Sequence, residues 1–329
     1  MSSSISTEKR AKSKFPDNPR IVFMGTPEFA VPSFKALMEN GSRVLAVVTQ
    51  PDRPKGRGRK MTPPPVKEAA LSYGLPVYQP ERASEQDFCE DIRSLKPHVL
   101  FVVAFGQVLK NQLLGIPSWG VLNTHASLLP RYRGAAPIHW AVLNKEEKTG
   151  LTAMKMDEGL DTGPILLQEE TGIFPGETTG ELHNRLAAMS GDFILKTLNL
   201  LKEGKIQEIP QDHSCATYAP KIDRGMSRIK WSRPAESVSA LMRGLDPWPG
   251  AFSTLGSKEI KLFSPKIRVE DRLKPLPGRI IGFKEDLVEV ETGDGVVGIA
   301  ELQAPGKKRL SAGDFLRGFK VDKGAVFGE

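Results

Sequence analysis

The sequence predicts an α/β protein with two domains, an N-terminal Rossmann-like domain built on a parallel sheet and a smaller, mostly β domain after it. The first observation is a regular alternation of short, β-branched apolar runs with segments of helical period over the first half of the chain. The second is a change after residue 228, where apolar runs follow one another with only turn residues between them. A length of 329 residues is sufficient for two separate hydrophobic cores.

Four apolar runs form the expected parallel sheet of the first domain. They resemble strands that are buried on both faces, and they span residues 20–24, 43–49, 98–104 and 119–124. Helical segments connect them, and several of these segments end near Gly or Pro. Residues 152–156 and 164–170 suggest two further strands, and one long helix over residues 178–204 closes the domain. We therefore expect the first domain to cover residues 20–205.

The remaining segments differ from this domain in composition. Residues 1–19 are rich in Ser and Lys and show no apolar periodicity, which predicts a disordered tail. Residues 206–227 are polar and contain Pro, which predicts a linker wrapped on the surface. In residues 228–329 the runs GRIIGF, LVEVET and VVGIAELQ are separated by turn signals, so we expect a small β domain, with a barrel as one option.

The composition limits where the protein acts and what it binds. The formal net charge of +7 favours a polyanionic partner. No apolar run approaches the length of about 20 residues that a membrane span needs, and no secretory signal opens the sequence. Cys89 and Cys215 lie far apart without clustered His residues, so we expect neither a disulfide framework nor a metal site. These features favour the cytoplasm, with an organelle as the alternative if residues 1–19 form a transit segment.

The segment QPDRPKGRGRKMTPPPVK, which follows the second strand, is the most unusual local sequence. It contains six basic residues, one acidic residue and five prolines. Its basic residues alternate with Gly and Pro, which predicts an extended, flexible arm suited to a phosphate backbone; the residues concerned are Arg53, Lys55, Arg57, Arg59 and Lys60. The alternative is a solvated charged loop without a ligand. The segment follows the carboxyl end of a strand, where open parallel sheets bind their ligands.

Asn123 and His125 stand two residues apart at the end of an apolar strand, so their side chains point to the same side of the sheet. Either residue alone is more typical of a polar group in a core, whereas the pair at a carboxyl strand end indicates a ligand site. In the loop DEGLDTGP, Asp161 is a third candidate and Asp157 is the competing carboxylate. A turn-forming role is the commoner one for an Asp in such a loop.

An amide, an imidazole and a carboxylate together suit acyl transfer between two nitrogens. The sequence shows no nucleophile motif, no metal-ligand spacing and no Gly-rich phosphate loop, so the substrate must supply the nucleophile. Asn123 and a His125 that is protonated or in its donor tautomer would stabilise the developing oxyanion. Asp161 would orient the imidazole and relay protons. The stiff turn SLLPRYRG is suited to form a wall that holds a flat ligand through its backbone.

Two motifs identify the chain as similar to the folate-dependent formyltransferases. They are N-x-H-x-S-L-L-P-x-x-x-G, which runs here from Asn123 to Gly134, and G-x-D-x-G, which runs from Gly159 to Gly163. Within that family the chain resembles, over nearly its whole length, the branch that acts on methionyl-tRNA. The further matching segments are MGTPEFA, the basic segment, RGAAPI, DPWPGAF and LQAPGKKRLSAGDF.

The resemblance implies transfer of the formyl group of 10-formyltetrahydrofolate to the α-amino group of methionyl initiator tRNA, without a metal. It implies that the catalytic residues are Asn123, His125 and Asp161. It also implies that the folate site is lined by Ser127, Leu128, Leu129 and Pro130.

The resemblance further implies how the tRNA is held. The basic segment would approach the acceptor stem, the C-terminal domain would be an OB-like barrel in contact with the tRNA, and Phe29 would lie near the methionyl side chain. We expect the protein to act as a monomer.

Other functions remain as alternatives at this stage. A formyltransferase acting on an amino sugar nucleotide or on glycinamide ribonucleotide would use the same three residues, but it would not need the basic segment and the second domain. A formyltetrahydrofolate hydrolase would replace the amine by water. A nucleic-acid-binding protein without activity would use the basic arm and a barrel, but it would leave Asn123, His125 and Asp161 without a task.

Overall fold

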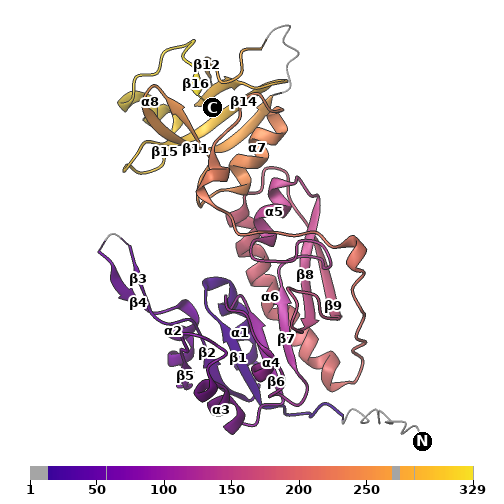
Figure 1. The fold of residues 1–329 in the computed structure, drawn as a ribbon. Helices are drawn as coiled ribbons and strands as arrows, with labels where there is room; N and C mark the ends of the chain where they lie inside the picture. Colours follow the sequence, from indigo (N-terminus) through magenta and orange to yellow (C-terminus); the bar gives the residue numbers. More distant parts are fainter. Residues whose placement is uncertain (1–13, 57, 269–274, 285, 329) are drawn as a thin grey trace, which may run out of the picture.

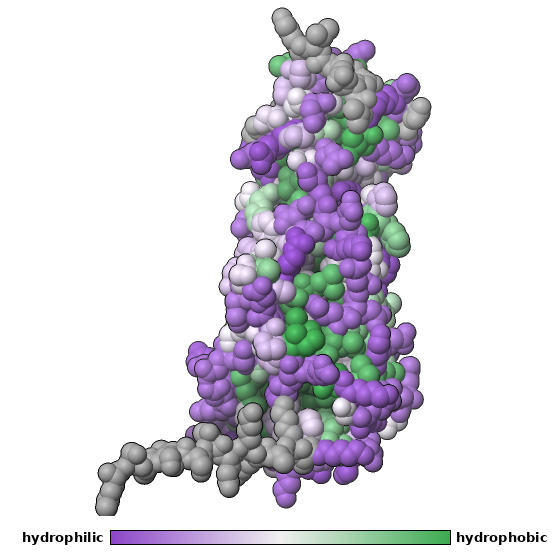
Figure 2. All heavy atoms as spheres, turned by 90° about the vertical axis from the view of Figure 1, so that its right-hand side faces the viewer, coloured by the Kyte–Doolittle hydropathy of each residue, from purple (hydrophilic) through white to green (hydrophobic). Residues whose placement is uncertain are grey.

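The computed structural model describes residues 14–56, 58–268, 275–284 and 286–328. It contains an N-terminal α/β domain and a C-terminal, mostly β domain that join end to end into an elongated body (Figures 1 and 2). The predicted fold class is confirmed.

The first domain is built on a seven-stranded sheet with the order β5-β2-β1-β6-β7-β8-β9. Its strands are β1 (Ile21–Gly25), β2 (Val44–Val48), β5 (Val77–Tyr78), β6 (Val99–Val103), β7 (Val121–His125), β8 (Lys148–Lys155) and β9 (Ile165–Gly172). The first five strands in this order are parallel, and β8 and β9 join as an antiparallel pair. Strands β1, β2, β6 and β7 lie on the four apolar runs that the sequence predicts.

Helices cover both faces of this sheet, which explains why its central strands are apolar throughout. The helices are α1 (Val31–Glu39), α2 (Pro65–Ser72), α3 (Gln86–Ser94), α4 (Asn111–Leu114), α5 (Pro137–Leu143) and α6 (Thr179–Lys202), and a short 3₁₀ helix η1 spans Glu28–Ala30. Alternate residues of β1 pack into two different cores: Ile21 and Phe23 face α1 and α6, while Val22 and Met24 face α3 and α4. Helix α6 begins with a capping box between Thr178 and Glu181.

The basic segment forms a two-stranded hairpin of β3 (Arg53–Lys55) and β4 (Lys60–Thr62), which projects from the first domain (Figure 1). The described residues of the predicted arm therefore pair with each other as two short extended strands. Gly56 has a φ of +73°, which glycine adopts readily, so the chain reverses and pairs with itself. Arg57 lies outside the described residues.

Residues 14–19 and the linker 206–227 both bury side chains against the first domain. Residues 1–13 of the expected tail lie outside the described residues, but Phe15 is 2% exposed and packs edge-on against Trp119 at a ring distance of 5.1 Å. The prediction of a disordered tail is thus wrong for this part, because an aromatic side chain gains from burial. The segment 206–227 includes the 3₁₀ helices η2 (His213–Cys215) and η3 (Arg224–Ser227), and it buries Gln211 and Ala219 against the first domain.

The second domain is an antiparallel barrel. Its elements are α7 (Ala235–Gly244), β10 (Phe252–Leu255), β11 (Lys258–Arg268), β12 (Ile280–Lys284), β13 (Leu287–Glu291), β14 (Val296–Gln303), β15 (Leu310–Ser311), α8 (Ala312–Gly318) and β16 (Phe327–Gly328). The main sheet runs β12-β13-β14-β11-β10-β16. Its two ends meet, because the backbone N–H of Ile280 donates to the Ala325 carbonyl and that of Phe327 donates to the Gly278 carbonyl, both at 2.8 Å.

The two domains meet at a junction formed by the start of α6 and the end of α7. The Thr179 hydroxyl donates to the Gly244 carbonyl at 2.9 Å, and the Gly180 N–H donates to the Asp246 carbonyl at 3.0 Å. The Arg243 guanidinium donates to the Glu177 carbonyl at 3.0 Å. These bonds fix the second domain against a helix that also borders the site described next.

Candidate active site

A cavity of about 700 Å³ lies at the carboxyl ends of the parallel strands β1, β6 and β7, where ligands bind in open parallel sheets. Asn123, His125 and Asp161 all line it, so the structure brings the three predicted residues together. Asn123 and His125 share one side of β7 because they are two residues apart. Asp161 enters from the loop between β8 and β9.

The His125 ring is fixed on two sides. Its Nε2 lies 2.9 Å from the Tyr132 carbonyl oxygen, and because a carbonyl only accepts hydrogen bonds, Nε2 carries a proton. Its Nδ1 lies 3.7 Å from Asp161 Oδ2. A neutral ring therefore has only a lone pair on the Nδ1 side. Of the two forms expected from the sequence, the protonated ring is the one that donates a hydrogen bond from Nδ1.

Asp161 is held in a conformation that is unusual for a residue other than glycine. Its φ is +52°, in the left-handed region, and its side chain is 13% exposed. Oδ2 accepts a 2.8 Å hydrogen bond from the backbone N–H of Gly134. Gly134 itself has a φ of +115°, and a Cβ at this position would lie 2.9 Å from the Ala219 carbonyl oxygen, so only glycine fits.

The competing carboxylate, Asp157, has the turn-forming role. One of its oxygens accepts hydrogen bonds from the Gly159 backbone N–H at 3.0 Å and from the Thr162 hydroxyl at 2.6 Å. This Asx-type arrangement shapes the loop that presents Asp161.

A pair of buried side chains behind the site was missed in the sequence. Gln211 donates from Nε2 to the carbonyl oxygens of Asp161 at 2.9 Å and of Gly163 at 2.8 Å. Its Oε1 accepts from Arg133 Nη2 at 2.6 Å and from Arg133 Nε at 3.1 Å. Arg133 and Gln211 are 2% and 6% exposed. Both ends of the Gln211 amide are thus occupied, and the pair holds the backbone of Asp161. The only sequence signal was an Arg within the turn SLLPRYRG.

Tyr132, whose carbonyl faces His125, is fixed by its own side chain. Its hydroxyl donates to Glu146 at 2.5 Å and accepts from Asn144 at 3.1 Å, and its backbone N–H donates to the Thr217 hydroxyl at 2.8 Å. Burial, together with the neighbouring Glu146, raises the pKa of the Tyr132 phenol. The neutral phenol therefore supports the position of the carbonyl that orients His125.

The turn residues expected to line the folate site lie outside this cavity. The residues concerned are Ser127, Leu128, Leu129 and Pro130. The backbone on either side of Leu128 is tied to β8, since the Thr152 hydroxyl donates to the Ser127 carbonyl at 2.6 Å and accepts from the Leu129 N–H at 3.1 Å. Leu128 lines a separate depression beside Arg131 and Glu146. The turn is thus held in place directly after the cavity-lining residue Ala126, and its contact with folate stays a prediction.

Two groups of residues complete the cavity wall. One group comes from the segment after β6 and from the loop that carries Asp161; it is mostly apolar and comprises Ala104, Phe105, Gly106, Gln107, Val108, Leu109, Met156, Asp157, Glu158, Gly159 and Leu160. The other group comes from η1, α5 and the start of α6, and it comprises Phe29, Pro137, Ile138, His139, Thr179 and His183. The rings of Phe29 and His183 meet edge to face at 5.2 Å. Burial lowers the pKa of His139, which favours the neutral ring.

The cationic side chains on the hairpin of β3 and β4 differ in whether they form an ion pair. Arg53 forms a 2.8 Å ion pair with Glu81, so the prediction that these cations are unpaired is wrong for this residue. Lys55, Arg59 and Lys60 are exposed and form no ion pair with another described residue. The base of the hairpin is anchored, because Asp52 accepts from Lys67 and Gln79, both at 2.8 Å. These hydrogen bonds lower the pKa of Asp52.

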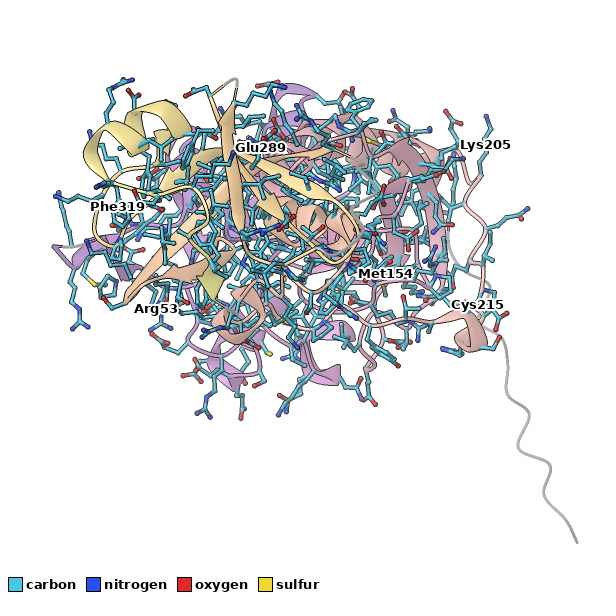
Figure 3. All side chains as sticks on the ribbon, turned by 90° about the horizontal axis from the view of Figure 1, so that it is seen from above. Arg53, Met154, Lys205, Cys215, Glu289 and Phe319 are labelled. Carbon is cyan, nitrogen blue, oxygen red and sulfur yellow. The ribbon has the colours of Figure 1, made fainter. Side chains whose placement is uncertain are left out.

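The position of the hairpin relative to the second domain follows from two views. In Figure 1 the hairpin tip and α8 lie on the same side of the molecule, and in Figure 3 Arg53 and Phe319 lie on one side while Lys205 and Cys215 lie on the other. Met154, which borders the cavity, lies between them in Figure 3. One side of the molecule therefore carries both the hairpin and the end of α8.

Comparisons with known families decide between the classes of protein left open. The family model described as formyl transferase matches residues 19–198, and the model described as its C-terminal domain matches residues 221–320. The chain belongs to the formyl transferase family. The family expected from the sequence motifs is thus confirmed, and a nucleic-acid-binding protein of another family is excluded.

Similar members of this family extend over both domains. A protein of Pelotomaculum thermopropionicum named methionyl-tRNA formyltransferase is 47% identical over 310 residues, which cover 94% of this chain and 99% of the relative. A protein of the same name from Citrifermentans bemidjiense is 48% identical over 311 residues, which cover 94% and 96%.

Solved structures support the fold of this formyl transferase family member. An N-formyltransferase from Helicobacter canadensis, in complex with folinic acid and dTDP-3-aminofucose, matches with a TM-score of 0.65 at 18% identity, covering 86% of this chain and 98% of that one. HypX from Aquifex aeolicus, in complex with tetrahydrofolic acid, matches with a TM-score of 0.63 at 18% identity, covering 93% and 49%. At this identity the likeness concerns the fold alone.

Within the described ranges, no group of three or more His, Cys, Asp and Glu side chains is placed to hold a metal ion. None of the described helices combines the length and apolar character of a membrane span.

Proposed function

We propose that this protein transfers the formyl group of 10-formyltetrahydrofolate to the α-amino group of methionyl initiator tRNA, which yields N-formylmethionyl-tRNA for translation initiation. The observation that carries the proposal is the convergence of Asn123, His125 and Asp161 on one cavity in a formyl transferase family member. Relatives named methionyl-tRNA formyltransferase, 47% and 48% identical over 94% of the chain, support the choice of substrate.

The reaction exchanges one carbon–nitrogen bond for another. The amine nitrogen attacks the formyl carbon, the carbonyl oxygen becomes an oxyanion, and the bond from carbon to N10 of the folate then breaks. The amine loses one proton and N10 gains one, so atoms and charges balance. In this scheme Asp161 accepts the proton from the amine and returns it to N10, directly or through water.

The oxyanion is the species that the site must stabilise most. The Asn123 side-chain amide forms no hydrogen bond with another described residue, so its N–H groups are free to donate into the cavity. His125 supplies the second donor when its ring carries a proton on Nδ1, and Asp161 Oδ2 lies 3.7 Å from that atom. Removing one such donor typically costs about 3 to 4 kcal/mol in the transition state.

The two groups of wall residues suggest where each substrate binds. We assign the folate to the apolar group around Phe105, Val108 and Leu160, because a flat heterocycle favours apolar walls and backbone hydrogen bonds. We assign the methionyl group to the side formed by Phe29 and His183. We also propose that Ser127, Leu128, Leu129 and Pro130 contact the folate, as the resemblance implies. The hydrogen bonds of Thr152 to the Ser127 and Leu129 backbone hold this turn in place.

The tRNA is the substrate for which the second domain and the hairpin are needed. The unpaired cations Lys55, Arg59 and Lys60 are exposed on the hairpin, and phosphate contacts of this kind position a nucleic acid without reading its sequence. The sequence also predicts Arg53 and Arg57 for this surface, and we include both. Arg53 forms an ion pair with Glu81 at the same time. We further propose that the protein acts in the cytoplasm, where tRNA is charged, and as a monomer.

A formyl transfer assay tests the proposal directly. The protein is incubated with 10-formyltetrahydrofolate and methionyl initiator tRNA, and N-formylmethionyl-tRNA is measured after hydrolysis of the ester. We expect product with the wild type and almost none with Asp161→Ala. Product with a dTDP-amino sugar but not with the tRNA would instead identify the alternative, an amino sugar formyltransferase.

A further inference from the structure

Trp248 is the exposed member of the four tryptophans of this chain, and its position has no role in the function described so far. Its exposed fraction is 62%, whereas Trp231 is fully buried and Trp119 and Trp140 are partly buried. An exposed indole in a folded protein is informative, because Trp normally buries most of its large apolar surface. The residue lies in the segment DPWPGAF, between α7 and β10.

The backbone that carries Trp248 is held on both sides. The Asp246 carboxylate accepts a 2.8 Å bond from Arg309, and the Pro249 carbonyl accepts a 2.6 Å bond from Lys261 Nζ. The Gly250 N–H donates to the Leu245 carbonyl at 2.9 Å. The indole Nε1 forms no hydrogen bond with another described residue. A fixed backbone with a free indole is suited to present a flat apolar surface to a ligand.

Trp248 also adjoins the side of the cavity assigned to the methionyl group. The imidazole of His139, which lines the cavity, faces the backbone of Trp248. The neighbouring Asp246 carbonyl accepts from Gly180, and the residue before Gly180 is the cavity-lining Thr179. The segment that carries the exposed indole therefore borders the part of the cavity wall that we assign to the methionyl group.

We propose that the Trp248 indole is a stacking surface for an unpaired base at the 3′ end of the tRNA. The inference rests on the proposed function, since the aminoacyl group is carried by the single-stranded 3′ end. Every nucleobase has a π-face that stacks on an indole, so the contact does not depend on a particular base. Its binding effect corresponds to a Kd change of about 5- to 150-fold for one stacked base.

The main test compares two uncharged RNAs and three proteins, and binding of methionyl-tRNA is measured beside them. The RNAs are uncharged initiator tRNA and the same tRNA without its unpaired 3′ nucleotides; the proteins are the wild type, Trp248→Ala and Trp248→Phe. We expect Trp248→Ala to bind the intact tRNA at least about 5-fold more weakly and Trp248→Phe to retain most of the affinity. The shortened tRNA should bind all three proteins equally, because it lacks the base that stacks.

Tyr218→Ala serves as the matched control, since Tyr218 is an aromatic residue with an exposed fraction of 63%. It should bind both RNAs as the wild type does. Equal binding of intact tRNA by Trp248→Ala and the wild type overturns the proposal, as does an equal loss with the shortened tRNA. A loss confined to methionyl-tRNA, with uncharged tRNA unaffected, also overturns it and assigns the indole to the methionyl side chain.

A turnover assay separates this inference from the proposed function. If the wild type forms no N-formylmethionyl-tRNA, the proposed function fails. If the wild type forms the product while Trp248→Ala binds tRNA normally, the stacking proposal alone fails.

Discussion

The catalytic centre and the basic hairpin are built in opposite ways. Asp161 is 13% exposed in its side chain, and its carboxylate and its backbone carbonyl are both hydrogen bonded. On the hairpin, Lys55, Arg59 and Lys60 are exposed and without an ion-pair partner among the described residues. Groups that stabilise a transition state must be positioned before the reaction, whereas groups that attract a polyanion need exposure more than a fixed position.

This comparison makes the effect of a substitution depend on the region. Changes in the catalytic centre should lower kcat, because the interactions concerned are made in the transition state. Changes in the hairpin should raise KM for the tRNA and alter its salt dependence while kcat stays constant.

The largest effect is expected for Asp161→Asn. The amide oxygen of Asn can still accept the 2.8 Å bond from Gly134, so the loop should keep its shape. The amide cannot accept a proton, and we expect kcat to fall about 1,000-fold. Single-turnover formylation of methionyl-tRNA measures this fall. A rate within tenfold of the wild type, with an unchanged thermal midpoint, would show that Asp161 does not transfer the proton.

Asn123→Ala should have the next largest effect. It removes one donor to the oxyanion and leaves the hydrogen bond between His125 and the Tyr132 carbonyl in place. We therefore expect kcat to fall about 100- to 1,000-fold. KM for both substrates should change little, because the lost bond forms in the transition state. An increase in the KM for 10-formyltetrahydrofolate at constant kcat would assign Asn123 to ground-state binding of the folate instead.

Local patterns in the sequence predicted part of this site. The spacing of two residues predicts that Asn123 and His125 share a side of a strand, and this depends only on the geometry of β structure. The choice between Asp157 and Asp161 could not be made, because it depends on which carboxylate the loop turns inward. The link from Gln211 to Asp161 joins residues that are 50 positions apart, so no local pattern shows it.

The prediction of the fold has the same limit, because contacts between distant segments leave no local pattern in the sequence. The parallel strands can be predicted from the sequence because burial on both faces gives continuous apolar runs. Strand β11 was missed, since Pro265 and the exposed residues around Lys266 interrupt its pattern, and its pairing with β14 skips Ser264, whose φ is +52°. The turn SLLP is expected to contact folate because it belongs to a motif. The structure shows how its backbone is bonded to Thr152, and the contact with folate stays a prediction.

Gln211→Glu tests how far the position of Asp161 depends on the hydrogen bonds that Gln211 donates to its loop. The carboxylate would still accept the bonds from Arg133, so we expect the thermal midpoint to stay close to that of the wild type. It cannot donate to the carbonyls of Asp161 and Gly163, so the loop loses two bonds. We expect kcat to fall about 10- to 100-fold, because small displacements of reacting groups have effects of this size.

Gln207→Glu is the matched control for this variant, since Gln207 is an exposed residue of the same type in the same segment. It should retain the kcat of the wild type. If Gln211→Glu also retains it, the bonds to the Asp161 loop have no part in catalysis, and Asp161 is positioned by Gly134 alone.

The smallest effect is expected from the hairpin, with Lys55→Ala and Lys60→Ala combined. These two residues are cross-strand partners, so their cations lie side by side without a carboxylate between them. Loss of two phosphate contacts should raise the KM for methionyl-tRNA several-fold and reduce the slope of log KM against log salt by about 1 to 2. The KM for 10-formyltetrahydrofolate and kcat should not change.

Lys205→Ala, on the opposite side of the molecule in Figure 3, provides the control and should leave both the KM for the tRNA and the slope unaltered. An equal rise in KM for the two variants would mean that the overall positive charge of the protein attracts the tRNA. The hairpin would then not be a specific tRNA-binding surface, and its contrast with the fixed catalytic centre would no longer hold.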